Sequence, residues 1–160
     1  MKEIIDVSTG QVKLGRGNVV LRSLAIGSCI AAAAYDCRAR IGAVAHIMLP
    51  GRAPQNSPEK TRYAEDAIEE LIGLMAGGSS SPGNLDVCLV GAGNVLRKAD
   101  DTICMANIRS TIQAFEQRDI PIRATALGGA DRKSIFLDIV TGKVSYTQGS
   151  GQKKVLWMPA

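Results

Sequence analysis

The sequence predicts an α+β domain in which layers of strands pack with two main helices. Short apolar, strand-like runs recur along the chain, whereas apolar residues at helical spacing fill only two stretches. Of the 160 residues, 46% are hydrophobic and 21% are charged, which provides enough apolar side chain for a core. We therefore expect residues 1–160 to form a single domain. Because only 4% of the residues are aromatic, its core must be built from aliphatic side chains.

The predicted strands are apolar or β-branched runs bounded by turn residues. After a leading segment with glycine turns, the strands of the first half cover residues 19–26, 30–35 and 43–49. Those of the second half cover residues 86–90, 120–126, 135–140 and 143–147. A Thr-Gly turn joins the last two runs and predicts a hairpin. The tail at residues 155–158 is either a final strand or a docking surface.

The two helices are predicted from capping residues and from apolar spacing. The first begins at Ser57, because a hydroxyl N-cap, a proline and an acid follow one another there, and it ends at Gly77. Its other side carries paired acids that we interpret as a solvated face. The second helix covers residues 102–117, with an apolar stripe at Met105, Ile108, Ile112 and Phe115.

Composition argues against several classes of protein. The net charge is +4, but basic residues such as the pair Arg132-Lys133 are scattered, so we expect solvated surface and no nucleic-acid site. No apolar run approaches the roughly 20 residues of a membrane span, and the first residues lack a signal-peptide core, which favours a cytoplasmic protein without membrane insertion. The four cysteines form no C-x-x-C pair and there is one histidine. No metal and no cofactor are therefore expected.

One cysteine and the single histidine carry the chemistry that the sequence predicts. Cys29 follows Gly27-Ser28, and His46 lies on the run that would pair with the strand after the cysteine. Pairing of these strands places both side chains at neighbouring open ends. A free thiol has a pKa of about 8.5, so an imidazole that accepts its proton makes it a nucleophile toward a carbonyl carbon. The backbone N–H groups of the turn can face a developing oxyanion. The alternative is that Cys29 is simply a small buried apolar residue.

Two motifs resemble the chemoreceptor glutamine deamidase family, CheD. They are Gly-Ser-Cys-Ile-Ala at residues 27–31 and Gly-Ala-Val-Ala-His-Ile-Met-Leu-Pro at residues 42–50. The resemblance extends from about Asp6 to Thr147 and is closest between residues 23 and 50. It implies a sandwich of β-sheets with the two main helices packed on one outer face. It also implies that Cys29 is the nucleophile and His46 the base.

Three further positions take their interpretation from this family. Ser23 stands where the family carries a threonine, so the resemblance implies that its hydroxyl orients His46; the alternative is an ordinary strand serine. Gly91 and Gly93 occupy a glycine-rich turn that the family places near the active site, together with Gly27 and Ser28 as an oxyanion and substrate loop. The turn with Gly91 and Gly93 is not a dinucleotide-binding motif, because the third glycine and the following helix are missing.

The start of the second helix departs from the family. The family pattern there is Ile-Gly-x-Arg-Asn, and this chain keeps Ile103 and Asn107 but has Cys104 and Ala106 in place of glycine and arginine. The family arginine would contact substrate or brace a loop. Its replacement leaves substrate preference and partner binding open.

The resemblance implies a protein-glutamine deamidase that regulates chemotaxis. A glutamine on a methyl-accepting chemoreceptor would be converted to glutamate and ammonia through a cysteine thioester, with methyl-ester hydrolysis at the same residues and a CheC-type phosphatase as partner. One alternative is a non-catalytic regulatory module that binds a CheC-type phosphatase or a receptor. Another is a stand-alone thiol amidase that acts on a different substrate with the same three residues.

Overall fold

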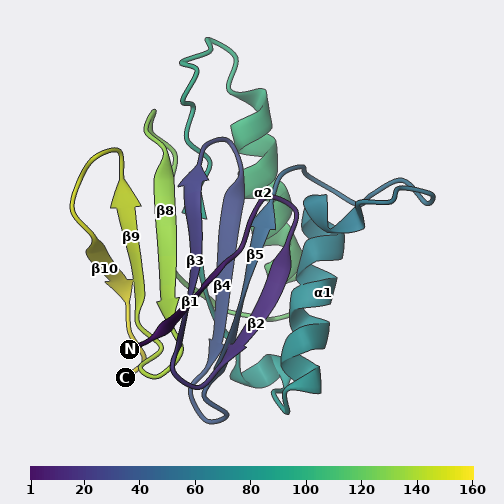
Figure 1. Cartoon of the computed structure of the whole chain (residues 1–160). Helices are drawn as coiled ribbons and strands as arrows, with labels where there is room; N and C mark the ends of the chain where they lie inside the picture. Colours follow the sequence, from purple (N-terminus) through teal and green to yellow (C-terminus); the bar gives the residue numbers. More distant parts are fainter.

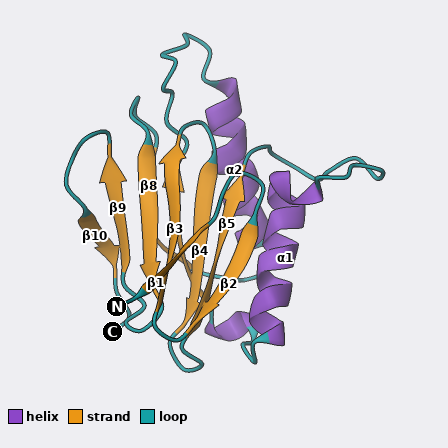
Figure 2. Cartoon of the chain, viewed as in Figure 1, coloured by secondary structure: helices purple, strands orange, loops and turns teal.

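The computed structural model describes residues 1–160 and contains two five-stranded mixed sheets with two helices (Figures 1 and 2). Sheet A consists, in spatial order, of β1 (Glu3–Asp6), β3 (Val19–Ile26), β8 (Lys133–Asp138), β9 (Val144–Gln148) and β10 (Lys154–Trp157). Sheet B consists of β2 (Val12–Arg16), β5 (Ile41–Ile47), β4 (Ile30–Asp36), β6 (Asp86–Gly91) and β7 (Ile122–Leu127). The helices are α1 (Ala64–Gly77) and α2 (Thr102–Glu116), with 3-10 turns at Lys60–Arg62 and Pro82–Asn84.

The molecule has three layers: sheet A, sheet B and the two helices on the outer face of sheet B (Figure 2). This confirms the predicted α+β sandwich with helices on one outer face. The central strand β4 is buried along its whole length, and its residues face alternate layers. Ala31 and Ala33 pack in the cluster between the sheets, whereas Ala32 and Ala34 pack against the helices. Small side chains on both faces of β4 fit a strand that is covered on both sides.

Helix α1 begins later than the sequence predicts. Ser57 accepts a bond from the Glu59 N–H in a local turn, and the helix starts only at Ala64. The backbone N–H groups of Met48 and Leu49 both donate to Arg62 O, and Ala64 N–H donates to Leu49 O. These bonds hold the chain beside the end of β5 and keep Tyr63 extended, so the α-helix cannot begin before Ala64.

The two ends of the chain complete the sheets. The leading segment contributes β1, which pairs parallel with β3, and β2, which pairs antiparallel with β5; neither strand was predicted. The tail forms β10 on the edge of sheet A, so its interpretation as a final strand is confirmed. The predicted hairpin is present as β8 and β9, joined by a turn at residues 139–143. Neither helix is long and apolar enough to cross a membrane.

Candidate active site

The chain crosses from sheet A to sheet B through the Cys29 turn, residues 27–29, which joins β3 to β4. In the antiparallel pair of β4 and β5, Ala31 stands opposite His46, so Cys29 lies two positions along the same strand face. Cys29 packs against the cluster between the sheets, and this is the side to which His46 also points. Pairing of these strands therefore brings the thiol and the imidazole to neighbouring ends, as predicted. No hydrogen bond joins them in this structure, and such contacts often tighten only when substrate binds.

His46 is held in one tautomer by Ser23. The Ser23 hydroxyl donates to the Val7 carbonyl oxygen at 2.7 Å and lies 2.8 Å from His46 Nδ1. A hydroxyl has one proton, so Ser23 must accept from Nδ1–H, which leaves Nε2 unprotonated and free to act as a base. Ser23 comes from sheet A and His46 from sheet B, so this bond links the two sheets. The structure thus places Ser23 at the position that an orienting residue needs.

Burial keeps the imidazole and the thiol uncharged. His46 is 4% exposed, and desolvation lowers its pKa, with a smaller opposing effect from the Val7 carbonyl. Desolvation likewise raises the pKa of the half-buried Cys29 thiol, opposed by the backbone N–H of Cys29 itself. At neutral pH the pair is therefore a neutral thiol beside a neutral imidazole. Use of this thiol as a nucleophile would therefore require transfer of its proton to a base.

The backbone of the Cys29 turn has unused donors. The N–H groups of Gly27, Ser28 and Cys29 have no hydrogen-bond acceptor in the protein. Such donors are what an oxyanion-binding turn requires.

The predicted glycine-rich turn lies directly against the Cys29 turn. Ala92 N–H donates to Cys29 O at 2.7 Å, and Gly93 N–H donates to Gly27 O at 2.8 Å. Gly91 has a φ of +132°, and a Cβ atom there would collide with the Cys29 carbonyl oxygen, so only glycine fits. A Cβ atom at Gly93 would collide with the Asp131 carbonyl oxygen. Because the Gly93 N–H is already engaged, this turn braces the Cys29 turn and its Gly93 donor is not available to a ligand.

Asn107 on α2 joins the two reactive segments, a role that sequence reasoning did not assign. Its fully buried side-chain amide donates to Ser28 O at 2.9 Å and to Met48 O at 3.1 Å. Ser28 precedes Cys29, and Met48 follows the strand of His46. One amide therefore sets the spacing between the two segments. The signal available in the sequence was that Asn107 survives in the altered motif at the start of the helix.

Two further titratable residues, Lys133 and Cys104, are buried. Lys133 is only 3% exposed, and its ammonium donates to the Gly128 carbonyl oxygen, so it is not solvated surface. Its long side chain reaches inward from the start of β8, and burial lowers its pKa. Cys104, at the family glycine position, is buried and lines the same cleft as Cys29. Burial, with a smaller contribution from Asp101, raises its pKa to about 11, so this thiol stays protonated.

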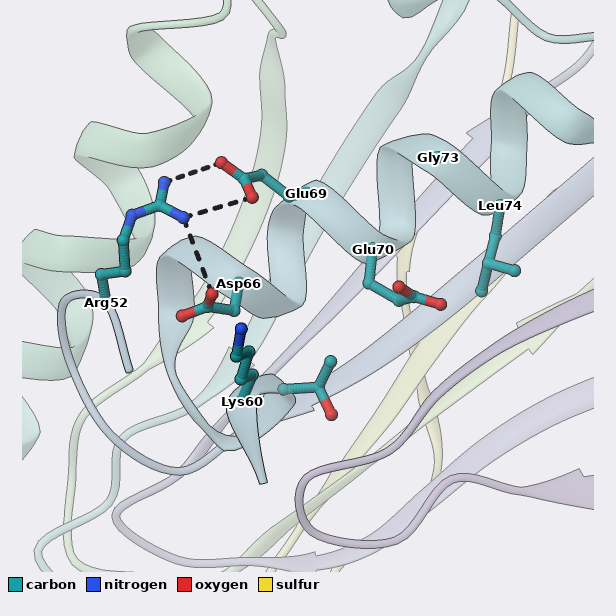
Figure 3. A pocket seen from close by; sticks show the side chains of 8 residues that line it. Arg52, Lys60, Asp66, Glu69, Glu70, Gly73 and Leu74 are labelled. Carbon is teal, nitrogen blue, oxygen red and sulfur yellow. Dashed lines mark hydrogen bonds and ion pairs between the residues drawn. The ribbon is translucent and has the colours of Figure 1, made fainter. Parts of the chain in front are cut away.

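Two hollows open beside the reactive pair and share Ala25 on their rims. The cleft on the Cys29 side has a volume of about 360 Å³, and the hollow on the His46 side has a volume of about 450 Å³. The largest hollow, about 630 Å³, lies elsewhere, along α1 (Figure 3). There Arg52 pairs with Glu69 and Asp66, and none of the lining residues is a cysteine or a histidine. No group of three or more histidine, cysteine or acidic side chains gathers as a metal site.

Comparison with known proteins identifies the family of this chain. Residues 48–148 match the family described as CheD chemotactic sensory transduction. A protein of Chlorobium luteolum is 41% identical over 150 residues, covering 93% of this chain and 75% of its own. Proteins of Pseudomonas syringae pv. syringae and Methanococcus maripaludis are each 31% identical, covering 86% and 95% of this chain and 84% and 99% of their own. All three are named "Probable chemoreceptor glutamine deamidase CheD". The chain therefore belongs to the CheD family.

Proposed function

We propose that this protein hydrolyses the side-chain amide of glutamine residues on chemoreceptors, producing glutamate and ammonia. The names of its relatives support the substrate and the reaction. The observation that carries the mechanism is the Ser23–His46 bond, because it leaves Nε2 as a free base on the strand face that Cys29 shares. The neutral state of both groups supports general-base activation of the thiol at the moment of attack.

The first half-reaction forms a thioester. As the Cys29 sulfur bonds to the amide carbon, its proton moves to His46 Nε2 and negative charge develops on the carbonyl oxygen. The free N–H groups of the Cys29 turn stabilise that oxyanion. When the carbonyl reforms, the carbon–nitrogen bond breaks, the imidazolium returns its proton to the nitrogen, and ammonia leaves.

The second half-reaction releases glutamate. His46, neutral again, takes a proton from a water molecule whose oxygen attacks the thioester carbon. The carbon–sulfur bond breaks, and the proton on His46 returns to the Cys29 sulfur. The sum is one amide and one water converted to one carboxylic acid and one ammonia, so the enzyme is regenerated without a cofactor.

The proposal also predicts a second reaction, a protein partner and a cellular location. A methyl ester at the same carbon would follow the same steps with methanol in place of ammonia. A CheC-type phosphatase is the expected protein partner, and the cytoplasm is the expected location. The replacement of the family glycine and arginine by Cys104 and Ala106 favours keeping the non-catalytic binding module as the second candidate.

The test uses the full chain with a glutamine-bearing cytoplasmic fragment of a chemoreceptor. Wild-type protein should release ammonia and raise the fragment mass by the difference between glutamine and glutamate. Cys29→Ala should abolish both signals, whereas Cys37→Ala, at an exposed thiol in the β4–β5 turn, should change neither. Unchanged turnover in Cys29→Ala would refute the nucleophile. Wild-type protein that binds the fragment without releasing ammonia would establish the binding module instead.

A further inference from the structure

The two hollows beside the reactive pair are both lined by Ala25. This exposed residue has a φ of +55° and lies where the pairing of β3 with β8 shifts register between Ser23 and Ile26. The irregular backbone forms a rim that both hollows share. Cys29 lines one hollow and His46 lines the other, so the nucleophile and the base open onto different spaces.

The chemistry of the proposed reaction assigns a role to the His46 side. One imidazole gives a proton to the departing nitrogen and later takes one from the incoming water. Both small molecules must therefore occupy the space that the imidazole faces. The acyl carbon, bonded to the Cys29 sulfur, stays with its side chain on the other side. A side-chain amide bound this way would have its carbon at the Cys29 sulfur and its nitrogen toward His46.

Polar groups contribute to the lining of the His46-side hollow, together with the apolar side chains of Leu24 and Ala25. The His46 side has a buried floor of Val7 and His46 and exposed walls that include Ser8 and Thr9. Asp6 stands at its edge, and Arg22, which donates to it at 2.7 Å, holds the pKa of that carboxyl below its usual range. Hydroxyls and a carboxylate suit water, ammonia and ammonium.

The Cys29 side carries apolar side chains at Val95, Leu96 and Ile103, next to the free N–H groups of the turn. Charged side chains of Lys98, Asp100, Asp101 and Arg132 complete its lining. Apolar walls suit the methylene groups of a glutamine side chain and the apolar surface of the protein that bears it. Leu96 is 75% exposed and Ile103 is 40% exposed. They can therefore contact an incoming protein without prior rearrangement.

We propose that the His46-side hollow is a leaving-group subsite, which takes ammonia or a small amine from the amide and then admits the hydrolytic water. The inference rests on the proposed function. A volume of about 450 Å³ leaves room for more than ammonia, so the enzyme should also accept a γ-N-methyl amide, with methylamine as the leaving group.

The experiment compares two receptor peptides that carry either glutamine or its γ-N-methyl amide at the same position. For the wild-type protein the ratio of kcat/KM for the methyl amide to that for the amide should lie within about tenfold of unity. Thr9→Trp and Leu24→Trp, on separate segments of the His46-side rim, should each lower this ratio by about tenfold or more, because the indole fills the space of the extra methyl group. Both positions are exposed, so neither change threatens the fold.

The matched variant fills the other hollow. Leu96→Trp should lower kcat/KM for both peptides in the same proportion and leave the ratio unchanged. Complete rejection of the methyl amide by wild-type protein, an unchanged ratio in both rim variants, or an altered ratio in Leu96→Trp would each overturn the subsite. Failure of the proposed function has a different signature, since wild-type protein would then release no ammonia from the glutamine peptide.

Discussion

The largest hollow of the molecule and its reactive site use charge in opposite ways. In the α1 groove, exposed charged side chains satisfy one another, and Arg52 binds Glu69 at 2.7 Å (Figure 3). At the reactive site, a buried serine, histidine and asparagine each have few and specific partners. Ion pairs in solvent contribute little, whereas buried polar groups fix geometry because leaving them unpaired is costly. The size of a hollow therefore says less about chemistry than the burial of the polar groups around it.

Among the residues that act on the thiol, His46, the buried base, should have the largest effect. His46→Gln keeps a side chain that can donate to Ser23 but removes the base, and kcat/KM should fall by about 10²–10⁴. Because burial lowers the pKa of His46, wild-type activity should hold through neutral pH and fall only below the usual histidine range near 6.5. The residual activity of the variant should lack this acidic fall. Steady-state ammonia release between acidic and mildly alkaline pH measures both.

Cys29 gives an independent check of the same neutral pair. Its raised pKa means that iodoacetamide should alkylate it slowly at neutral pH and faster as the pH passes the usual thiol value of about 8.5. Rapid alkylation at neutral pH would instead indicate a thiolate–imidazolium pair. That result would contradict the neutral resting state on which the proposed order of proton transfers depends.

Ser23 should have the next largest effect, through the tautomer of His46. Ser23→Ala removes the acceptor of Nδ1–H and leaves the buried Val7 carbonyl without its donor, which costs about 1–3 kcal/mol of stability. We expect kcat to fall by about tenfold to a hundredfold with little change in KM, since substrate does not contact Ser23. Ser23→Thr keeps the hydroxyl and should retain most of the activity. Equal loss in both variants would mean that packing, and not the hydroxyl, matters at this position.

Asn107 should have a smaller effect than Ser23, because it sets only the spacing between the Cys29 and His46 segments. Asn107→Ala leaves the Ser28 and Met48 carbonyls without a donor, and stability should fall by about 1–3 kcal/mol. As the Cys29 and His46 segments lose their link, kcat should fall by about tenfold while KM stays. The matched control is Thr111→Val, one helical turn along, where a buried hydroxyl has no partner. Removing it should leave activity unchanged and stability equal or slightly higher. Equal loss of kcat in the two variants would show that α2 acts only as packing.

Much of this site could be predicted from the sequence, because its main elements are local. Cys29 lies directly before β4 and His46 lies on β5, so their approach follows from one short hairpin. Ser23 sits on the strand that enters the turn, and the resemblance to the CheD family located it. The relative positions of these three residues can be inferred without knowledge of the rest of the fold.

The residues that were missed depend on contacts between distant segments. Strand β1 exists because it pairs with β3, and Val7, just after it, accepts the Ser23 proton. Asn107 acts only once α2 packs across two turns that are remote in the chain. Lys133 looks like surface by composition, yet its ammonium is drawn to the carbonyl of Gly128. That residues 1–160 form one cooperative folding unit also depends on such long-range contacts, and it stays a prediction.

The smallest effect should come from the α1 groove, despite its volume. Arg52→Ala removes the guanidinium that contacts Glu65, Asp66 and Glu69. More than half of the Arg52 side chain is exposed, and Arg118 remains within 3.3 Å of Glu65, so solvent and a second cation take over most of the interaction. We expect unchanged kcat and KM and a thermal midpoint close to that of the wild type. Because salt screens exposed charges, any small difference should shrink as the ionic strength rises. A marked loss of turnover would show that this groove contacts the substrate protein, and the division between a reactive region and an inert charged surface would have to be redrawn.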